Sequence, residues 1–284
     1  MTAKRAILAA LLLLVICAAV AAAWLDSQFE EADAEEIASL VGHLGATSVL
    51  AVFAHPDDEI LAAGTLAEAA SRPGSIVRLI TATRGEAGIP DESVCRAEDL
   101  AVVRHAEVLK HGYQLGLNGQ QVWRHPDGML DQLIDPIALE IVREIRSLRP
   151  SLIITFDPAS GYTFHPDHRA IGSATARARR LAADPAFRPD LGSPHEVRWL
   201  AFVLVPSGIM QKFGGEPGAR VVQHQVPARF AVPIDQGVKI RAWSIHESQY
   251  DYTRRVWGVP PWLLYRFFDK EHYAVEESGG ARSP

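Results

Sequence analysis

The sequence predicts an α/β protein with a doubly wound, mostly parallel sheet, a Rossmann-like arrangement with helices on both faces. Strand-like apolar runs alternate with helix-length segments along most of the chain, and this alternation is typical of successive β-α-β units. The chain has 284 residues, of which 48% are hydrophobic and 22% charged. These values suit one large globular domain with a sizeable core.

The expected elements follow from apolar patterning. Ala32–Leu44 has helical spacing and ends at Gly45. Continuous apolar or β-branched runs predict buried strands at Val49–Phe53, Ile76–Thr81, Leu152–Phe156 and Trp199–Val205. Helices are expected at Ile60–Ala70, Ala97–His111, Ile137–Leu148, Arg169–Ala182 and Val238–Glu247. Residues 206–233 are rich in Gly and Pro and predict loops with one or two edge strands, and residues 276–284 predict a disordered tail.

A leader precedes the domain. Lys4 and Arg5 are followed by an uninterrupted run of apolar or small residues, Ala6–Leu25, and then by acidic residues. This order is typical of an export signal, and about 20 apolar residues also suffice to span a bilayer uncleaved. Residues 1–25 are therefore either a signal peptide or a membrane anchor. Both interpretations place the domain, residues 26–275, outside the cytoplasm as a secreted or membrane-anchored protein.

Composition excludes two other classes. The formal net charge is −6, and the sequence has no basic stripe of the kind that binds nucleic acid. The chain has two cysteines, Cys17 in the leader and Cys95, so no disulfide framework is expected.

The first chemically informative motif follows the first buried strand. It runs from His55 through Asp57 and Asp58 to Glu59, at the carboxyl end of a strand, where ligands bind in open α/β sheets. Imidazole and carboxylate are preferred zinc ligands. Taken alone, the motif is also compatible with two carboxylates that only cap the following helix.

A second motif, from His165 through Asp167 to His168, lies between the Leu152–Phe156 strand and the next expected helix. Two such clusters at matching topological positions are hard to explain as helix caps. Three protein ligands with an open fourth position are typical of a catalytic zinc site. The two motifs together therefore predict a metal centre.

With these motifs the sequence resembles the PIG-L / LmbE-like de-N-acetylase family. The family's Ala-His-Pro-Asp-Asp-Glu motif matches Ala54–Glu59, and its His-Pro-Asp-His motif matches His165–His168. Weaker matches follow in the family's order, at Thr83–Glu86, Arg104, Glu107, Asp127–Gly128, Arg149–Pro150 and His246–Gln249.

The resemblance implies a role for each matching residue. His55, Asp58 and His168 would bind zinc, and Asp57 would act as the general base. Since N and O ligands discriminate weakly among divalent ions, Fe²⁺ would also fit. His165 in its protonated form would stabilise an oxyanion, and Asp167 behind it would hold its orientation.

Two further residues are expected to bind substrate. The resemblance implies that Arg84 contacts sugar hydroxyls. Relatives that act on acetylated thiol sugars have a tyrosine close before the second motif, and Tyr162 stands three residues before His165. The expected substrate is an N-acetylated sugar, glycan or glycolipid head group, with membrane association through the leader and no nucleic-acid partner.

The chemistry supports the same function. Zinc can activate water and polarise a carbonyl, so amide hydrolysis needs no Ser or Cys nucleophile, and the sequence has no Gly-x-Ser-x-Gly motif. The alternatives are an exported metallohydrolase of another amide or ester bond and a non-catalytic carbohydrate-binding protein. The second alternative is disfavoured because a vestigial site has no need of Asp57 beside its ligands.

Overall fold

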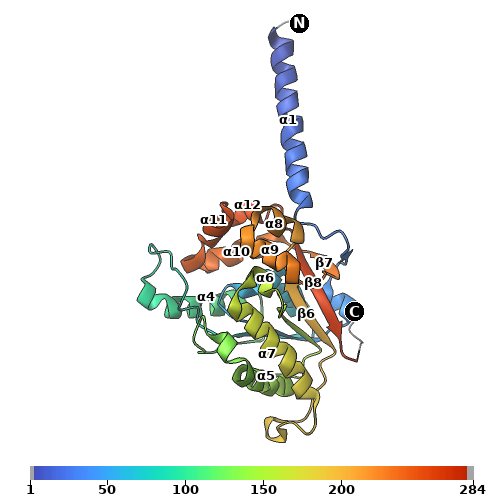
Figure 1. Cartoon of the computed structure of the whole chain (residues 1–284), viewed down its shortest axis with the longest axis vertical. Coiled ribbons are helices and arrows are strands. Elements are labelled where there is room, and N and C mark those ends of the chain that lie inside the picture. The colour runs from blue at the N-terminus through green and yellow to red at the C-terminus, as the bar shows by residue number, and fades with distance from the viewer. Residues whose placement is uncertain (1–2, 280–284) are drawn as a thin grey trace.

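The computed structural model describes residues 3–279, and its centre is one eight-stranded sheet (Figure 1). The strand order is β1-β7-β8-β6-β5-β2-β3-β4. The strands are β1 (Glu35–Glu36), β2 (Ser48–Phe53), β3 (Ile76–Thr81), β4 (Gly119–Val122), β5 (Leu152–Phe156), β6 (Trp199–Leu204), β7 (Phe230–Pro233) and β8 (Lys270–Glu277). The five strands from β6 to β4 pair in parallel, which confirms the predicted sheet type.

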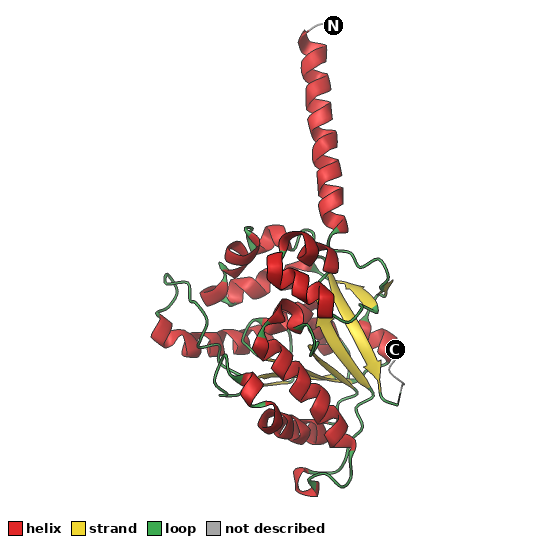
Figure 2. Ribbon diagram, in the orientation of Figure 1, coloured by secondary structure: helices red, strands yellow, loops and turns green. Residues whose placement is uncertain are grey.

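Helices cover both faces of this sheet (Figure 2). The α-helices are α1 (Ala3–Ser27), α2 (Leu40–Leu44), α3 (Ala63–Ser71), α4 (Leu100–Gln114), α5 (Ile134–Leu148), α6 (Gly161–Phe164), α7 (Pro166–Ala183), α8 (Ser207–Phe213), α9 (Gly215–His224), α10 (Gln236–Ile245), α11 (Tyr252–Trp257) and α12 (Pro261–Leu264). Short 3₁₀ helices are η1 (Asp58–Ala62), η2 (Ala97–Asp99), η3 (Leu130–Gln132), η4 (Pro189–Leu191) and η5 (Glu247–Gln249). Helices α5 and α7 pack together on β2 and β5, and α3, α4 and α10 pack together elsewhere on the sheet.

The order of the strands positions the functional site. From β2 the chain moves outward through β3 to β4, and it then returns to β5 on the other side of β2. The two halves of the parallel sheet therefore diverge between β2 and β5, and such a switch point leaves a crevice beyond the carboxyl ends of the strands. The residues that follow β2 and β5 meet at this crevice.

Two expectations for the fold were wrong, and two strands were missed. Ala32–Leu44 is not one helix, since β1 pairs with β7 before the short helix α2 begins. The segment expected to consist of loops contains α8 and α9, and β7 lies inside the sheet between β1 and β8. Strands β4 and β8 were not predicted, because β4 is short and polar and the charged sequence of β8 does not look buried.

Strand β8 also changes the expected boundary of the domain. It pairs antiparallel with both β6 and β7, and Glu276 and Glu277 pair with Leu200 and Trp199. The first two residues of the expected tail are therefore part of the sheet. Residues 280–284 of that tail lie outside the described residues.

Helix α1 projects from one end of the domain (Figure 1). Its segment Ile7–Ser27 has 21 residues and none of it is buried in the structure. A helix of 21 residues is about 30 Å long, close to the thickness of the hydrocarbon core of a bilayer. Length and composition therefore permit this helix to cross a membrane.

Candidate metal centre and active site

The turn after β2 is held by the carboxylate of Asp58. Its Oδ2 accepts hydrogen bonds from the backbone N–H groups of Ala54 (3.1 Å) and His55 (2.7 Å). Oδ1 then remains free to face the crevice. Burial would raise the pKa of Asp58, but the adjacent His168 and His55 outweigh it and hold this pKa well below its ordinary value. The group is therefore a carboxylate in the folded protein.

The three residues expected to bind a metal meet at one point. Nδ1 of His55 lies 3.2 Å from Nε2 of His168. Asp58 places Oδ1 3.2 Å from the His168 nitrogen and Oδ2 3.4 Å from the His55 nitrogen. Ligand atoms at about 2.0–2.1 Å from a tetrahedral zinc ion lie about 3.3–3.4 Å apart. The two spacings from Nε2 of His168, to Nδ1 of His55 and to Oδ1 of Asp58, therefore suit a zinc ion, whereas the contact of His55 is with Oδ2 of Asp58, which also accepts the two backbone hydrogen bonds. A nitrogen of His165 also lies within 4.8 Å of ligand nitrogens of His55 and His168.

In His55 and His168, the ring nitrogen that faces away from the proposed metal position, here called the outer nitrogen, has partners that orient the ring. Nε2 of His55 lies 2.9 Å from Oδ1 of Asp127 and 3.3 Å from Oδ2 of Asp167. Nδ1 of His168 lies 2.9 Å from the carbonyl oxygen of Gly161. If each outer nitrogen carries the proton, the inner nitrogens present lone pairs to the same point. Metal-binding histidines are commonly oriented in this way.

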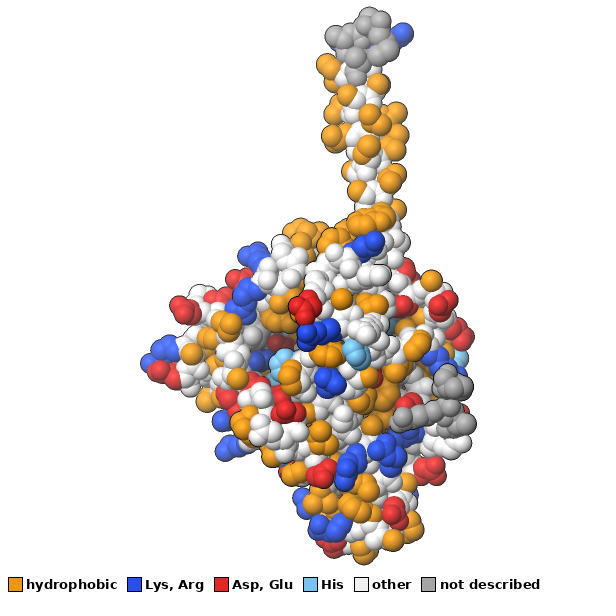
Figure 3. All heavy atoms as spheres, viewed as in Figure 1, with side chains coloured by type: hydrophobic (Ala, Val, Ile, Leu, Met, Phe, Trp, Pro, Cys, Tyr) orange, Lys and Arg blue, Asp and Glu red, His pale blue; other side chains and the backbone are white. Residues whose placement is uncertain are grey.

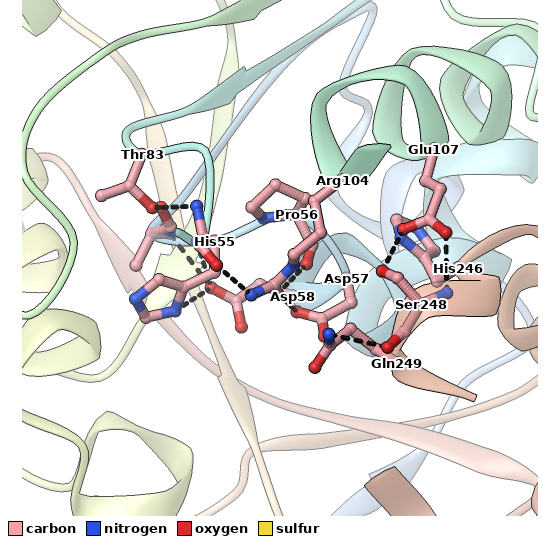
Figure 4. Close-up of polar contacts among 12 residues, drawn as sticks. His55, Pro56, Asp57, Asp58, Thr83, Arg104, Glu107, His246, Ser248 and Gln249 are labelled. Atoms are coloured by element: carbon pink, nitrogen blue, oxygen red, sulfur yellow. Dashed lines mark hydrogen bonds and ion pairs between the residues drawn. The ribbon is translucent and has the colours of Figure 1, made fainter. Parts of the chain in front are cut away.

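Asp57 lies beside the point where His55, Asp58 and His168 meet, but its carboxylate is directed elsewhere. Its backbone is left-handed, with φ 107°, so its side chain leaves the turn in a different direction from that of Asp58. Oδ1 of Asp57 lies 3.1 Å from a guanidinium nitrogen of Arg104 (Figure 4). Burial raises the pKa of Asp57 to about 6, although Arg104 opposes the shift. Asp57 also lines the cavity in front of the centre.

Arg104 occupies a space that only glycine leaves open. Its guanidinium donates to the carbonyl oxygens of Gly85 and Pro56. A Cβ at position 85 would collide with that guanidinium, and the φ of +67° there also favours glycine. The Thr83–Glu86 match in the sequence therefore has a structural reason, which is to let Arg104 reach Asp57.

His165 caps α7 and lies at the edge of the centre. Its ring centroid is 5.1 Å from that of His55 and 4.8 Å from that of His168. Burial and the two neighbouring histidines lower the pKa of His165 to about 4. The expected protonated form is therefore wrong for the resting protein at neutral pH. Since Nδ1 accepts a hydrogen bond from the N–H of Asp167 (3.2 Å), the proton of the neutral ring is on Nε2.

The expected contact of the Asp167 carboxylate with His165 was also wrong. That carboxylate accepts hydrogen bonds from the backbone N–H groups of Gly128 (2.7 Å) and Leu130 (3.0 Å). It lies against His55 instead, as described above. The cause is geometrical, because Asp167 is in the first turn of α7 and its side chain points back into the crevice.

The two expected substrate-binding residues differ in their placement. Tyr162 is buried and lines the cavity, in a strained turn where Gly161, Tyr162 and Phe164 all have φ near +60°. Burial keeps its phenol neutral by raising its pKa well above the ordinary value. Arg84 is half-buried but is not among the residues that line the cavity, whose arginines are Arg104 and Arg255.

Sequence reasoning missed a buried polar cluster behind Asp57. One carboxylate oxygen of Glu59 lies 2.6 Å from Nδ1 of His111 and 2.7 Å from Nε2 of His246. Burial would raise the pKa of Glu59, but the two histidines hold it far below the ordinary value. The presence of Glu59 in the first motif and of His246 in a weaker match was the only signal in the sequence.

The cavity in front of the centre has a volume of about 480 Å³. Its polar end is formed by the residues described above. The rest of its wall is largely apolar and comes mainly from the C-terminal half of the chain, with Phe29 after α1 and Leu61 of η1; the C-terminal members include Ile209, Trp243, Trp257, Leu264, Tyr265 and Phe268. The cavity can therefore hold a molecule with both a polar and an apolar part.

Comparisons with known proteins agree with this geometry. The family model described as "PIG-L: GlcNAc-PI de-N-acetylase" matches residues 50–179. A 1D-myo-inositol 2-acetamido-2-deoxy-alpha-D-glucopyranoside deacetylase of Streptomyces scabiei is 34% identical over 292 aligned positions, which cover 86% of this chain and 88% of the relative. A deacetylase of the same name from Frankia casuarinae is 29% identical, with 82% and 87% of the two chains covered.

Two solved structures share the fold. N,N'-diacetylchitobiose deacetylase from Pyrococcus horikoshii superposes with a TM-score of 0.64 at 20% identity, over 84% of this chain and 86% of that one. A conserved protein from Thermus thermophilus superposes with a TM-score of 0.56 at 26% identity, over 83% and 99%. The resemblance read from the motifs is thereby confirmed, and the chain belongs to the PIG-L, or LmbE-like, family.

Proposed function

We propose that this protein is a zinc-dependent N-deacetylase that removes the acetyl group from an acetamido sugar. The observation that carries the proposal is the convergence of His55, Asp58 and His168, with Asp57 beside them in an ion pair with Arg104. The names of the relatives support the proposal that an acetamide bond is cleaved, because the Streptomyces and Frankia proteins are deacetylases of an acetamido-glucopyranoside.

The metal would be held by Nδ1 of His55, Oδ1 of Asp58 and Nε2 of His168. When bound, a zinc ion supplies Lewis-acid chemistry, since it makes a water molecule more acidic and polarises a carbonyl group. The donors are nitrogen and oxygen only, so Fe²⁺ would also suit them.

Asp57 would act as the general base. Its carboxylate faces the cavity, and the guanidinium of Arg104 restrains it at 3.1 Å. Burial moves its pKa toward neutrality, where a carboxylate can both accept a proton and return it. A cation bound next to it would lower this pKa again by favouring the charged form. Asp57 can thus take a proton from water and deliver it to the leaving amine.

His165 would stabilise negative charge on the substrate oxygen as a neutral donor. Its Nδ1 already accepts from the backbone, so its Nε2–H is available to donate toward the cavity that it lines. One donor aimed at a developing oxyanion contributes a few kcal/mol to catalysis in other hydrolases, roughly 3–4 kcal/mol. Tyr162 and Arg84 would contact the sugar.

The substrate we propose is an N-acetylglucosamine-type head group on an envelope glycan or glycolipid. The supporting features are the partly apolar cavity wall and the leader, which would place the domain outside the cytoplasm as a secreted or anchored protein. Cell fractionation tests the location. An intact, unprocessed chain in the soluble cytoplasm would contradict it.

Acetate release from a panel of N-acetyl sugars tests the activity. We expect release by the wild-type chain and almost none by Asp57→Asn, since a general base commonly contributes about 10²–10⁴ in rate. Release from other amides or esters but from no acetamido sugar would support the alternative metallohydrolase. Sugar binding without any hydrolysis would support the carbohydrate-binding alternative.

A further inference from the structure

Helix α1 is joined to the domain almost without a spacer. It ends at Ser27, and Phe29 is already buried in the domain, with its ring 5.5 Å from that of Phe268. Trp24 near the end of α1 packs edge-on against Phe213 of α8, with ring centroids 6.3 Å apart. A membrane that contains α1 would therefore lie directly against the part of the domain from which α1 projects.

That part of the domain is built from α8, α11 and α12 (Figure 1). It carries large apolar side chains that point to solvent, and the space-filling view shows apolar atoms gathered around the base of α1 (Figure 3). We call the four large ones and their basic neighbours the α1-proximal face. The apolar members are Trp24, Phe213, Val256 and Trp262, each at least 50% exposed, and the exposed basic members are Lys212, Arg254, Arg255 and Arg266.

This composition fits the interfacial zone of a bilayer. Tryptophan is enriched at the level of the lipid head groups, where its ring is half solvated. Lysine and arginine near the surface are attracted to anionic lipids, at about 1 kcal/mol each. A face with both kinds of residue, next to a helix long enough to span the membrane, has a lipid surface as its natural partner.

The α1-proximal face also forms part of the wall of the catalytic cavity. Arg255 and Val256 belong to this face and line the cavity, and so does Trp257, the last residue of α11. Phe29, directly after α1, lines the same cavity. Since Arg255 and Val256 are exposed as well, a lipid surface in contact with this face would lie directly beside the wall of the cavity.

We propose that the α1-proximal face rests on the surface of the bilayer into which α1 inserts, so that the wall of the cavity lies beside the lipid interface. The partner is a membrane surface with anionic head groups. This inference concerns where the domain sits and does not depend on which bond the enzyme breaks.

Site-directed fluorescence quenching in the full chain tests the proposal. Cys17 and Cys95 are replaced by serine, and one new cysteine carries an environment-sensitive dye, at Trp262→Cys or at Phe213→Cys. The proteins are reconstituted in vesicles of phosphatidylcholine and phosphatidylglycerol, with and without one of two quencher lipids, one with its quencher near the head group and the other with its quencher near the end of an acyl chain. Both sites are exposed, so the substitutions should leave the fold intact.

Two matched labels serve as controls. Ala186→Cys is exposed, in the segment after α7 at the end of the domain away from α1 (Figure 1). Cys17 in the Cys95→Ser chain reports on the insertion of α1 itself. We expect the dye at positions 213 and 262 to lose most of its fluorescence with the head-group quencher, the dye at position 17 with the acyl-chain quencher, and the dye at position 186 with neither.

Two results would overturn the proposal. Quenching at position 17 alone would mean that the domain is held away from the bilayer. Absence of quenching at all four positions would mean that no membrane contact exists. Weaker quenching at 213 and 262 in vesicles of phosphatidylcholine alone would support the role of the basic residues.

Discussion

The backbone N–H of Asp57 donates a 3.0 Å hydrogen bond to Oε2 of Glu59, two residues further along the chain. This contact links the proposed base to the buried cluster behind it, because the other oxygen of Glu59 lies against His111 and His246. Asp57 has a left-handed backbone that a non-glycine residue adopts only at a cost. We infer that Glu59 stabilises the conformation that separates Asp57 from Asp58.

The first prediction therefore concerns Glu59→Gln. Burial would lower the pKa of His246, but Glu59 outweighs it and raises that pKa above its ordinary value. Loss of the carboxylate leaves this buried imidazole without its counter-charge. Breaking a buried charge pair costs roughly 3–5 kcal/mol, so we expect a loss of that size in the free energy of unfolding.

Urea denaturation in the presence of a chelator measures this loss without a contribution from metal. Glu68→Gln is the matched control, because Glu68 pairs with Arg72 where both side chains are partly exposed. Such pairs contribute about 0–1 kcal/mol. Equal, small losses for Glu59→Gln and Glu68→Gln would contradict the importance of the buried cluster.

The second prediction concerns acid stability and His272 in β8. Its ring is 1% exposed, and burial together with Lys239 and Lys270 lowers its pKa to about 4. The unfolded chain then binds more protons than the folded one between about pH 6.5 and pH 4, so this stability is present above pH 6.5 and is lost as the pH falls.

For this group we expect the free energy of unfolding to fall by about 2 kcal/mol between pH 7 and pH 5. His272→Leu removes the titrating group. Between pH 7 and pH 5 the free energy of unfolding of this variant should therefore fall by about 2 kcal/mol less than that of the wild type. Urea denaturation at the two pH values gives both differences. Identical pH dependence in the variant and the wild type would show that His272 does not titrate in this way.

The third prediction concerns substrate binding by Arg84. We expect Arg84→Ala to lower kcat/KM for an acetamido sugar by an equivalent of ~1–3 kcal/mol, the usual cost of losing a charged hydrogen bond. Steady-state acetate release measures it, with Arg96→Ala as the control, since Arg96 is exposed and pairs only with nearby carboxylates. An unchanged kcat/KM would mean that Arg84 does not contact the substrate.

Four of the five parallel strands were predictable because they are largely buried, whereas β4 is short, polar and half-buried and was missed. Largely buried strands are continuous apolar runs, and β2, β3, β5 and β6 all appear as such in the sequence. Strand β8 could not be predicted in this way. Its buried Glu271 is satisfied by the backbone N–H groups of Gly64 and Thr65, more than 200 residues away in sequence.

In the site, too, some features could be predicted from the sequence and others could not. The convergence of His55 and His168 follows from two short motifs at the ends of neighbouring strands, and the sequence contains both motifs. The contact of Asp127 with His55 and that of His246 with Glu59 join segments that no pattern connects. The pKa of His165 likewise depends on how close the other two rings lie, which only the structure shows.

The metal content of two purified variants tests the central claim most directly. We expect wild-type protein and Asp57→Asn to contain about one zinc ion per chain and His168→Ala to lose most of it, since His168 is one of the three proposed ligands and Asp57 is not. Asp57→Asn should nevertheless lose nearly all turnover. Full metal occupancy in His168→Ala, or loss of zinc from Asp57→Asn in step with its activity, would contradict the assignment.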